Sequence, residues 1–365
     1  MGRIDTWRVK TEKHSWILSW VYRSYYRFRI RRLVKMAYKT QNIDDAWRDL
    51  FNFAAVDKPS EQTCHVIEGF LGEQIELMKE SKKPPEKNDI ILICVEKNSI
   101  AYLEQFLSYY RNIGIRQFLM IDNSSTDGTL EYLLEEGDVT LFMANTPFES
   151  QIKVGWILQA VRETGLDRCY LRVDIDEFLS WENMEGSSVN ELVLKAREQG
   201  MSTIRSVMAD MYPSWALMDP SHEDPDFLNE YVYFDDSSSY YHDKWKDRIF
   251  GGMRGRLIGA KLRMDKYILF QPERGQIPVN NHDVTGVHKE EEKICRCVLR
   301  HYKFLPSQKE KLSFDANTDA SGYSNFGELK KYNILLRENV LAAGVASVRY
   351  ESSKSLGKLD FIVPL

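Results

Sequence analysis

The run Ile90-Ile91-Leu92-Ile93-Cys94-Val95 decides the fold class of this 365-residue chain. Six consecutive apolar residues, several of them β-branched, are typical of a parallel strand that is buried on both faces. An amphipathic helix is expected next, over residues 101–113, and Gly114 suits the left-handed position that ends a helix. A strand followed by such a helix predicts the first βα unit of a parallel sheet.

The alternation of strands and helices continues beyond this unit. We expect strands at 117–121, 139–143, 169–173 and 203–208, and helices at 126–135, 151–162 and 189–198. This order predicts a doubly wound α/β fold (Rossmann-like), with a mixed, mainly parallel sheet flanked by helices. Ligands of such sheets bind at the carboxyl ends of the strands. The pattern then weakens: residues 212–247 are expected to be irregular, with later strands at 266–270 and 297–302 and a helix at 328–343.

Composition limits the class of protein. Hydrophobic residues form 43% of the chain, charged residues 28%, and the formal net charge is −5, which excludes a globally basic nucleic-acid binder. The five cysteines are scattered and odd in number, so we expect reduced thiols without a disulfide framework. No apolar run approaches the roughly 20 residues of a membrane span, and no signal peptide is recognised. We expect a cytoplasmic protein.

Four regions separate on composition. Residues 1–80 predict a helical extension, 81–88 a Lys- and Pro-rich linker, 89–345 the α/β domain and 346–365 a tail. The extension carries eleven basic residues and two acids between Arg3 and Lys39, interleaved with aromatic residues. Such a segment fits the inner face of the cytoplasmic membrane through residues 1–40, a helix packed on the domain with a solvated basic edge, or an RNA-binding arm. Nucleic acid is the least favoured of the three.

Two motifs carry chemistry. Asp122-Asn123-Ser124-Ser125-Thr126-Asp127-Gly128-Thr129 follows a strand, where Asp122 can accept hydrogen bonds from a base or ribose and Ser125 or Thr126 can cap the next helix. The alternative is that this segment has no functional role and is a strand–helix connection with well-capped ends. In Asp174-Ile175-Asp176-Glu177, residues at i and i+2 of a strand end can face one site and share a cation. Oxygen ligands suit Mg²⁺ or Mn²⁺. The alternative is a solvated acidic strand end.

Together with Val95-Glu96-Lys97-Asn98, these motifs resemble family-two glycosyltransferases with the GT-A fold, and among them bacterial enzymes of surface polysaccharides. Later segments fit the same group: Tyr233-Phe234-Asp235, Gly251-Gly252-Met253-Arg254-Gly255-Arg256, Asn281-His282-Asp283 and Arg300-His301-Tyr302-Lys303-Phe304. The resemblance covers about residues 89–335. It implies a metal-dependent, inverting transfer of a sugar from a nucleotide-sugar, with uridine as the base, to a glycan or lipid-linked acceptor.

The resemblance also implies residue roles. The donor-binding candidates are Val95, Glu96, Asn98, Asp122, Lys153, Asp174 and Lys303, and the candidates for holding Mn²⁺ or Mg²⁺ are Asp174, Asp176, His301 and, more weakly, His282. Arg254 and Arg256 follow two glycines, and guanidinium groups on such a loop suit a phosphate, although a turn with solvated charges would look the same. The Glu-Asp pair in which many members carry the catalytic base does not follow this loop, so Asp283 and Asp210 are the substitutes.

Two other functions remain open. A nucleotidyltransferase would also hold a metal between strand-end carboxylates, but it normally has a Gly-rich basic loop after the first strand, where this chain has one lysine and no glycine. A non-catalytic sugar- or lipid-binding scaffold could keep the same fold. The absence of a GxGxxG fingerprint after the first strand counts against a dinucleotide-dependent oxidoreductase.

Overall fold

The computed structural model describes residues 5–72, 75–222, 226–318, 326–337 and 339–365. Its centre is a six-stranded sheet in the spatial order β1-β4-β3-β2-β5-β12. The strands are β1 (Glu76–Lys79), β2 (Ile90–Glu96), β3 (Gln117–Asp122), β4 (Val139–Met143), β5 (Cys169–Arg172) and β12 (Leu269–Phe270). The four inner strands are parallel, and β1 and β12 are antiparallel edges. The α/β class and the mixed, mainly parallel sheet are confirmed.

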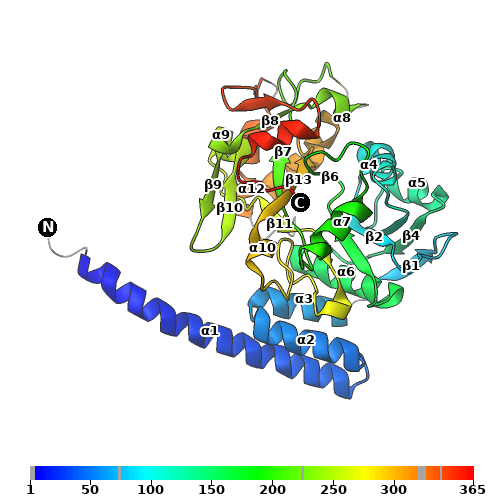
Figure 1. Cartoon of the computed structure of the whole chain (residues 1–365), viewed down its shortest axis with the longest axis vertical. Helices are drawn as coiled ribbons and strands as arrows, with labels where there is room; N and C mark the ends of the chain where they lie inside the picture. Colours follow the sequence, from blue (N-terminus) through cyan, green and yellow to red (C-terminus); the bar gives the residue numbers. More distant parts are fainter. Residues whose placement is uncertain (1–4, 73–74, 223–225, 319–325, 338) are drawn as a thin grey trace.

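Helices cover both faces of this sheet (Figure 1), and every residue of β2 is therefore buried. On one face, Leu92 and Cys94 share a core with α4 (Ile100–Asn112), α5 (Thr129–Glu135) and α7 (Val189–Glu198). On the other face, Ile91 and Ile93 share a core with α6 (Ser150–Thr164) and the N-terminal helices. The continuous apolar run therefore has the double burial that its sequence predicts.

A second, four-stranded sheet lies beside the first, in the order β11-β7-β13-β6. Its strands are β6 (Glu177–Ser180), β7 (Arg205–Asp210), β11 (Asp265–Tyr267) and β13 (Cys295–His301). The strand expected at 266–270 is divided between the two sheets, with Ile268 at the junction. The Ile268 N–H donates to Ile204 O at 3.0 Å, and Ile268 O accepts from Arg172 N at 2.7 Å. Segment 265–270 thus joins the two sheets.

The remaining elements form short ribbons and helices around the second sheet. They are α8 (Phe227–Glu230), β8 (Tyr233–Asp235), β9 (Tyr240–Asp243), β10 (Arg248–Gly251), α9 (Gly252–Ile258), α10 (Glu290–Lys293), α11 (Lys309–Asn317), α12 (Phe326–Leu329), α13 (Tyr332–Leu335) and β14 (Ser347–Arg349). Region 212–247 is therefore less irregular than expected. The single helix expected at 328–343 is wrong: α12 and α13 are two short helices on α11, and the Val340 carbonyl accepts from Leu217 N at 2.9 Å instead of continuing a helix. The tail joins the domain through β14, which pairs with β8.

Helix α5 also begins later than expected, at Thr129 instead of residue 126. Gly128 stands at its N-cap with φ of 95°, a conformation that glycine adopts without strain, and no side chain caps the helix. All five cysteines are free and buried, as expected of reduced thiols. Among the helices of the described residues, none has the length and apolar character needed to cross a bilayer.

The helical extension is confirmed as α1 (Asp5–Lys39), α2 (Asp45–Asp57) and α3 (Glu61–Leu71). Figure 1 shows α1 at the periphery, its N-terminal half projecting from the body. Helix α3 crosses α6 where Gly69 meets Gly155, and the Gln159 amide donates to Gly69 O at 3.1 Å. Residues 76–79, expected to be helical, form β1 because they pair with β4. The division of the chain at 81–88 stays a prediction.

The crossing of α3 and α6 depends on the absence of a side chain at Gly155. A Cβ there would lie 2.6 Å from the carbonyl carbon of Gly69, and backbone cannot move aside as a flexible side chain can. We expect Gly155→Ala to lower the free energy of unfolding by about 1–3 kcal/mol. Denaturant unfolding of the full chain measures it.

Gly255→Ala is the matched control, because Gly255 is also helical and the nearest neighbour of its added Cβ is 3.8 Å away. Alanine favours a helix over glycine by roughly 1 kcal/mol, so this variant should be neutral or slightly stabilised. Equal destabilisation by the two substitutions would show that the crossing is not tight.

Candidate functional site

The loops that follow β2 and β3 hold each other at the carboxyl edge of the sheet. The Asn98 N–H donates to Ser125 Oγ, and the Thr126 N–H donates to Asn98 Oδ1, both at 2.8 Å. Asp127 Oδ2 accepts from Ile100 N at 3.1 Å. Ser125 and Thr126 therefore tie two loops together instead of capping α5, whereas Asp127 also accepts from Thr129 N, at the start of α5, through Oδ1 at 3.1 Å. Asn98, expected in a base pocket, has its side-chain oxygen engaged in the same contact.

Glu96 and Asp122 end β2 and β3 as direct neighbours in the parallel register. Both are buried, and Asp122 Oδ1 accepts from Ser125 N at 2.9 Å. Among the described residues no N–H group donates to a carboxyl oxygen of Glu96 or to Asp122 Oδ2, and the side chains that interact with Glu96 are those of Asp122 and Ser99. Burial, together with the neighbouring carboxyl of Asp122, raises the pKa of Glu96 well above its usual range. Buried polar atoms without partners call for an explanation, and a bound ligand is one.

Asp174 lies just beyond β5 and is held by two lysines. Its Oδ1 accepts from Lys153 Nζ on α6 at 2.6 Å, and its Oδ2 lies 3.3 Å from Lys266 Nζ on β11. Lys266 also donates to Glu177 Oε2 at 2.7 Å. Burial alone would raise the pKa of Asp174, but the two ammonium groups outweigh it and the net pKa is lowered.

Asp176 has different partners from Asp174. Its Oδ2 lies 3.1 Å from Lys303 Nζ and 3.4 Å from His301 Nε2. Strand β5 ends at Arg172, and the Glu177 N–H donates to Asp174 O at 3.0 Å in a turn. The two aspartates are therefore not strand residues at i and i+2, so strand geometry does not set their common orientation, although the charge of Asp176 still acts on Asp174.

His301 is placed by the register of the second sheet, in which it stands beside Asp210 of β7. His301 Nδ1 lies 2.7 Å from Asp210 Oδ1, and Arg254 Nε donates to Asp210 Oδ2 at 2.9 Å. Burial lowers the pKa of His301, but the carboxylates of Asp176 and Asp210 outweigh it, so the net pKa is raised. Asp210 thus orients His301 and has no free oxygen for a substrate proton, which argues against its expected role as the base.

The fit of a divalent cation depends on Asp176 and His301. Their facing atoms are 3.4 Å apart, and a carboxylate on the far nitrogen of the histidine is the usual support of a metal-binding imidazole. Among the described residues, however, no group of three His, Cys, Asp or Glu side chains is arranged to hold a metal ion. The donor set fits an ion that takes its other ligands from phosphate and water, as Mg²⁺ commonly does.

Three charged residues near this site were not found from the sequence. Lys266 reaches Asp174 from β11. Lys311 of α11 donates to Lys97 O at 2.7 Å, and burial together with Lys303 lowers its pKa. Asp315, one turn further along α11, is buried, and burial raises its pKa although Lys303 and Lys311 act in the opposite direction. No motif marks these residues: the position of β11 brings Lys266 near, and that of α11 brings Lys311 and Asp315.

Several expected site residues have structural contacts instead. Arg254 bonds Asp210 and Tyr332, and Arg256 makes two bonds to Asp235 at 2.8 and 2.7 Å. Arg254 is therefore enclosed within the protein, and Arg256 is held by Asp235 although its side chain stays partly exposed.

Asp283 and His282, the two candidates that follow the Gly251–Gly252 loop, are also engaged in contacts within the protein. Asp283 is held by two bonds from Arg263, both at 2.9 Å, so neither oxygen is free to act as a base. His282 Nδ1 lies 2.8 Å from Asp265 O, and burial followed by the charge of Arg263 lowers its pKa to about 4. Val95 is buried in the core on the α6 side.

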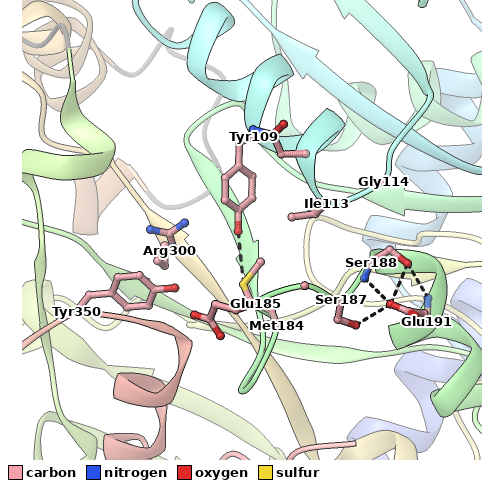
Figure 2. A pocket seen from close by; sticks show the side chains of 12 residues that line it. Tyr109, Ile113, Gly114, Met184, Glu185, Ser187, Ser188, Glu191, Arg300 and Tyr350 are labelled. Atoms are coloured by element: carbon pink, nitrogen blue, oxygen red, sulfur yellow. Dashed lines mark hydrogen bonds between the residues drawn. The ribbon is translucent and has the colours of Figure 1, made fainter.

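A cavity of about 650 Å³ lies on the other side of β13 (Figure 2). Arg300 lines it, whereas the adjacent His301 faces Asp176, because successive strand residues point to opposite faces. The Arg300 guanidinium lies 4.6 Å from the ring centre of Tyr350 and 5.3 Å from that of Tyr109. No residue of the carboxylate and lysine set lines this cavity, so it is separate from the strand-end site.

Neither a protein-family model nor a curated protein matches this sequence. Among solved structures, HddC from Yersinia pseudotuberculosis complexed with GMP-PN aligns over 50% of this chain and 77% of its own, with 9% identity and a TM-score of 0.28. A 4-diphosphocytidyl-2C-methyl-D-erythritol synthase aligns over 69% of this chain and 99% of its own, with 12% identity and a TM-score of 0.28. Similarities this weak carry no argument, so the function must be argued from the site itself.

The raised pKa of Glu96 gives a test in the absence of any ligand. The folded protein favours the protonated carboxyl, whereas the unfolded chain ionises near the ordinary pKa of 4.5. Unfolding then releases a proton, so stability falls as the pH rises above that value. Because Gln cannot ionise, Glu96→Gln should be about 1–3 kcal/mol more stable than the wild type at pH 8 and equal to it at pH 4.

Thermal unfolding followed over this pH range measures the difference. Glu104→Gln, on the exposed side of α4, is the matched control and should follow the wild type at every pH. If the stability of Glu96→Gln changed with pH in the same way as that of the wild type, the raised pKa of Glu96 would be contradicted.

Proposed function

We propose that this protein is a glycosyltransferase that moves a sugar from a nucleotide-sugar donor to a hydroxyl group of a glycan or lipid-linked acceptor. The observation that carries the proposal is the gathering of Glu96, Asp122, Asp174 and Asp176 at the carboxyl ends of parallel strands, next to Lys303, Lys311 and His301. Ligands of parallel α/β sheets bind at this edge. The acidic part suits the donor groups of a base and ribose, and the basic part suits a diphosphate.

Each part of the donor has a proposed partner. Glu96 and Asp122, with their unbonded oxygens, would accept from the base or ribose, and uridine is the base that the resemblance implies. Lys303 and Lys311 would neutralise the diphosphate. Lys153 holds Asp174 at 2.6 Å and would orient it toward the ribose. A surface-polysaccharide or lipopolysaccharide acceptor, inversion at the anomeric carbon and a cytoplasmic location follow from the resemblance and stay predictions.

Asp176 and His301 would hold the divalent cation, Mn²⁺ or Mg²⁺, with Asp210 fixing the imidazole. The bound ion supplies positive charge that stabilises the leaving diphosphate. Lys303, which already contacts Asp176 Oδ2 at 3.1 Å, would add a second positive charge beside it. The chain's own contribution is to bring these groups together from β13 and the turn after β5, so that they need no reorganisation when the donor binds.

The base that removes the acceptor proton is proposed to be Asp315. Asp210 and Asp283 are engaged by arginines, whereas Asp315 makes none of the hydrogen bonds recorded among the described residues. It lies near Lys303 and Lys311, where the diphosphate would bind. A carboxyl with a raised pKa near a binding site is a candidate for acid–base work.

A nucleotidyltransferase is the second candidate. It would release or consume pyrophosphate, and this activity separates it from sugar transfer. The segment after β2 contains Lys97 but no glycine that would let a backbone wrap the phosphates. A non-catalytic scaffold is the third candidate, and it would bind a sugar or lipid without turnover.

The first test is binding and hydrolysis of a panel of nucleotide-sugars with and without Mn²⁺. A donor at about 100 times its Kd should add roughly 2.7 kcal/mol to the stability of the fold. We expect metal-dependent stabilisation by one nucleoside diphosphate and its sugar, with slow release of the free sugar. Asp176→Asn should abolish both, whereas Asp360→Asn, on an exposed residue, should change neither.

Three other results would have distinct meanings. Exchange of pyrophosphate into a nucleotide would favour the nucleotidyltransferase. Stabilisation by sugars alone would favour the scaffold. No stabilisation by any nucleotide would remove the transferase proposal altogether.

The proposed base has its own test. Asp315→Asn should lower kcat about 10²–10⁴-fold and leave donor binding unchanged. Because the base must be ionised and its pKa is raised above the ordinary 3.8, wild-type activity should fall as the pH drops toward that raised pKa. The variant should lack this acid limb. An Asn variant with wild-type kcat and the same pH profile would exclude Asp315 as the base.

A further inference from the structure

Helix α1 has two different long faces between Ser19 and Lys39. The inner face is formed by Tyr26, Ile30, Val34 and Ala37, which are buried in one core with α2, α3 and α6. Arg29 fixes this packing with an ion pair of 2.7 Å to Glu68 of α3. The outer part of α1 therefore points away from the body of the protein, and Figure 1 shows α2 and α3 between α1 and the sheet.

The opposite face combines apolar and basic side chains. Residues three or four positions apart lie on one side of a helix. At this spacing the outer face carries Val21, Tyr25, Phe28, Arg32, Lys35, Met36 and Lys39. All seven are exposed, with Phe28 at 68% and Met36 at 56%. Trp20, at 63%, lies beside them. Exposed apolar groups in such a row mark an interaction surface.

The charge of this helix is opposite to that of the rest of the molecule. Between Ser19 and Lys39 the sequence has seven Lys and Arg residues and no Asp or Glu, although the whole chain has a formal net charge of −5. A partner that meets the outer face must accept positive charge and apolar side chains together.

We propose that the outer face of α1 docks on a bilayer surface that contains anionic lipids. Phe28 and Met36 would enter the boundary between headgroups and acyl chains, while Arg32, Lys35 and Lys39 would pair with lipid phosphates. Long basic side chains can reach phosphates while their stems lie against apolar groups. The helix would lie along the surface.

This occupant fits the face better than the alternatives do. A second copy of the chain would bring Arg32, Lys35 and Lys39 against like charges, which opposes pairing through this face. A nucleic acid would satisfy the charges and could stack on Tyr25 and Phe28, but it would leave the aliphatic groups of Val21 and Met36 without an apolar partner. Because this proposal does not rest on any catalytic residue, it stands or falls independently of the sugar-transfer proposal.

The experiment is flotation of the full chain with vesicles of neutral phosphatidylcholine, with and without a third of phosphatidylglycerol. We expect binding only to the anionic vesicles, weakening with added salt. The variant with Arg32→Gln, Lys35→Gln and Lys39→Gln should bind about a hundredfold more weakly. The matched control changes three exposed lysines elsewhere, Lys82, Lys83 and Lys87, to Gln and should bind as the wild type does.

A second pair of variants tests insertion of the apolar groups. Phe28→Ser with Met36→Ser should reduce vesicle binding at least tenfold. Leu194→Ser, at an exposed apolar residue of α7, should not. Circular dichroism of each variant checks that the fold is kept.

Several outcomes would overturn the proposal. The first is wild-type protein that binds neutral and anionic vesicles equally well, or binds neither. The second is a loss of vesicle binding that is equally large in the α1 charge variant and in its lysine control. Vesicle binding that is unchanged by the Phe28 and Met36 substitutions would show that the face binds through charge alone, without insertion of apolar side chains. Concentration-dependent dimers that the outer-face variants abolish, or binding to single-stranded RNA that the apolar changes weaken, would assign the face to another partner.

Discussion

The junction of the two sheets depends on the balance of charge around Asp174 and Asp176. Each carboxylate is held by cations from distant parts of the chain: Lys153 and Lys266 for the first, Lys303 and His301 for the second. Removing one of these cations would leave its carboxylate less well compensated and would lower the stability of the fold. The positions of α6, β11 and β13 are thus coupled to one another through two side chains.

The same arrangement fixes the side chains of the strand-end site in place. Asp210 and Arg254 continue the network behind His301, so the imidazole is held from its far side and presents Nε2 to Asp176. A ligand that binds here meets charged groups already in position. This preorganisation suits a polyanionic donor and is the physical basis of the proposed transfer.

The four parallel strands of the first sheet could be predicted from the sequence because they are almost entirely buried, whereas the exposed edge strand β1 was expected to be helical. Residues 90–95 and 139–143 carry their apolar character locally, and the structure places strands there. Segment 266–270 could not be resolved in the same way. Its division between two sheets depends on hydrogen bonds of Ile268 to Ile204 and Arg172, more than sixty residues away in the chain.

The acidic half of the candidate site could be recognised at strand ends, whereas Lys153, His301 and Lys303 were expected only through the family resemblance. Asp122, Asp174 and Asp176 lie at or just after the ends of apolar strands, and that position can be recognised in the sequence. Arg254 and Arg256 looked like phosphate ligands because a guanidinium next to glycines has the same sequence signature whether it bonds a ligand or a buried Asp. Asp315 follows no motif, and only tertiary packing reveals that it lies near Lys303 and Lys311.

The register of β13 has a consequence for the order in which the protein matures. Asp176 and Lys303 are separated by 127 positions in the chain. His301, in β13, is paired with Glu177 of β6 on one side and with Asp210 of β7 on the other. A ribosome therefore completes the four parallel strands well before it delivers the groups that neutralise Asp176. A slip of β13 by one residue would turn Arg300 toward the aspartate and His301 toward the opposite cavity. The strand-end site is thus a late product of synthesis, and its assembly reports that the second sheet has paired in register.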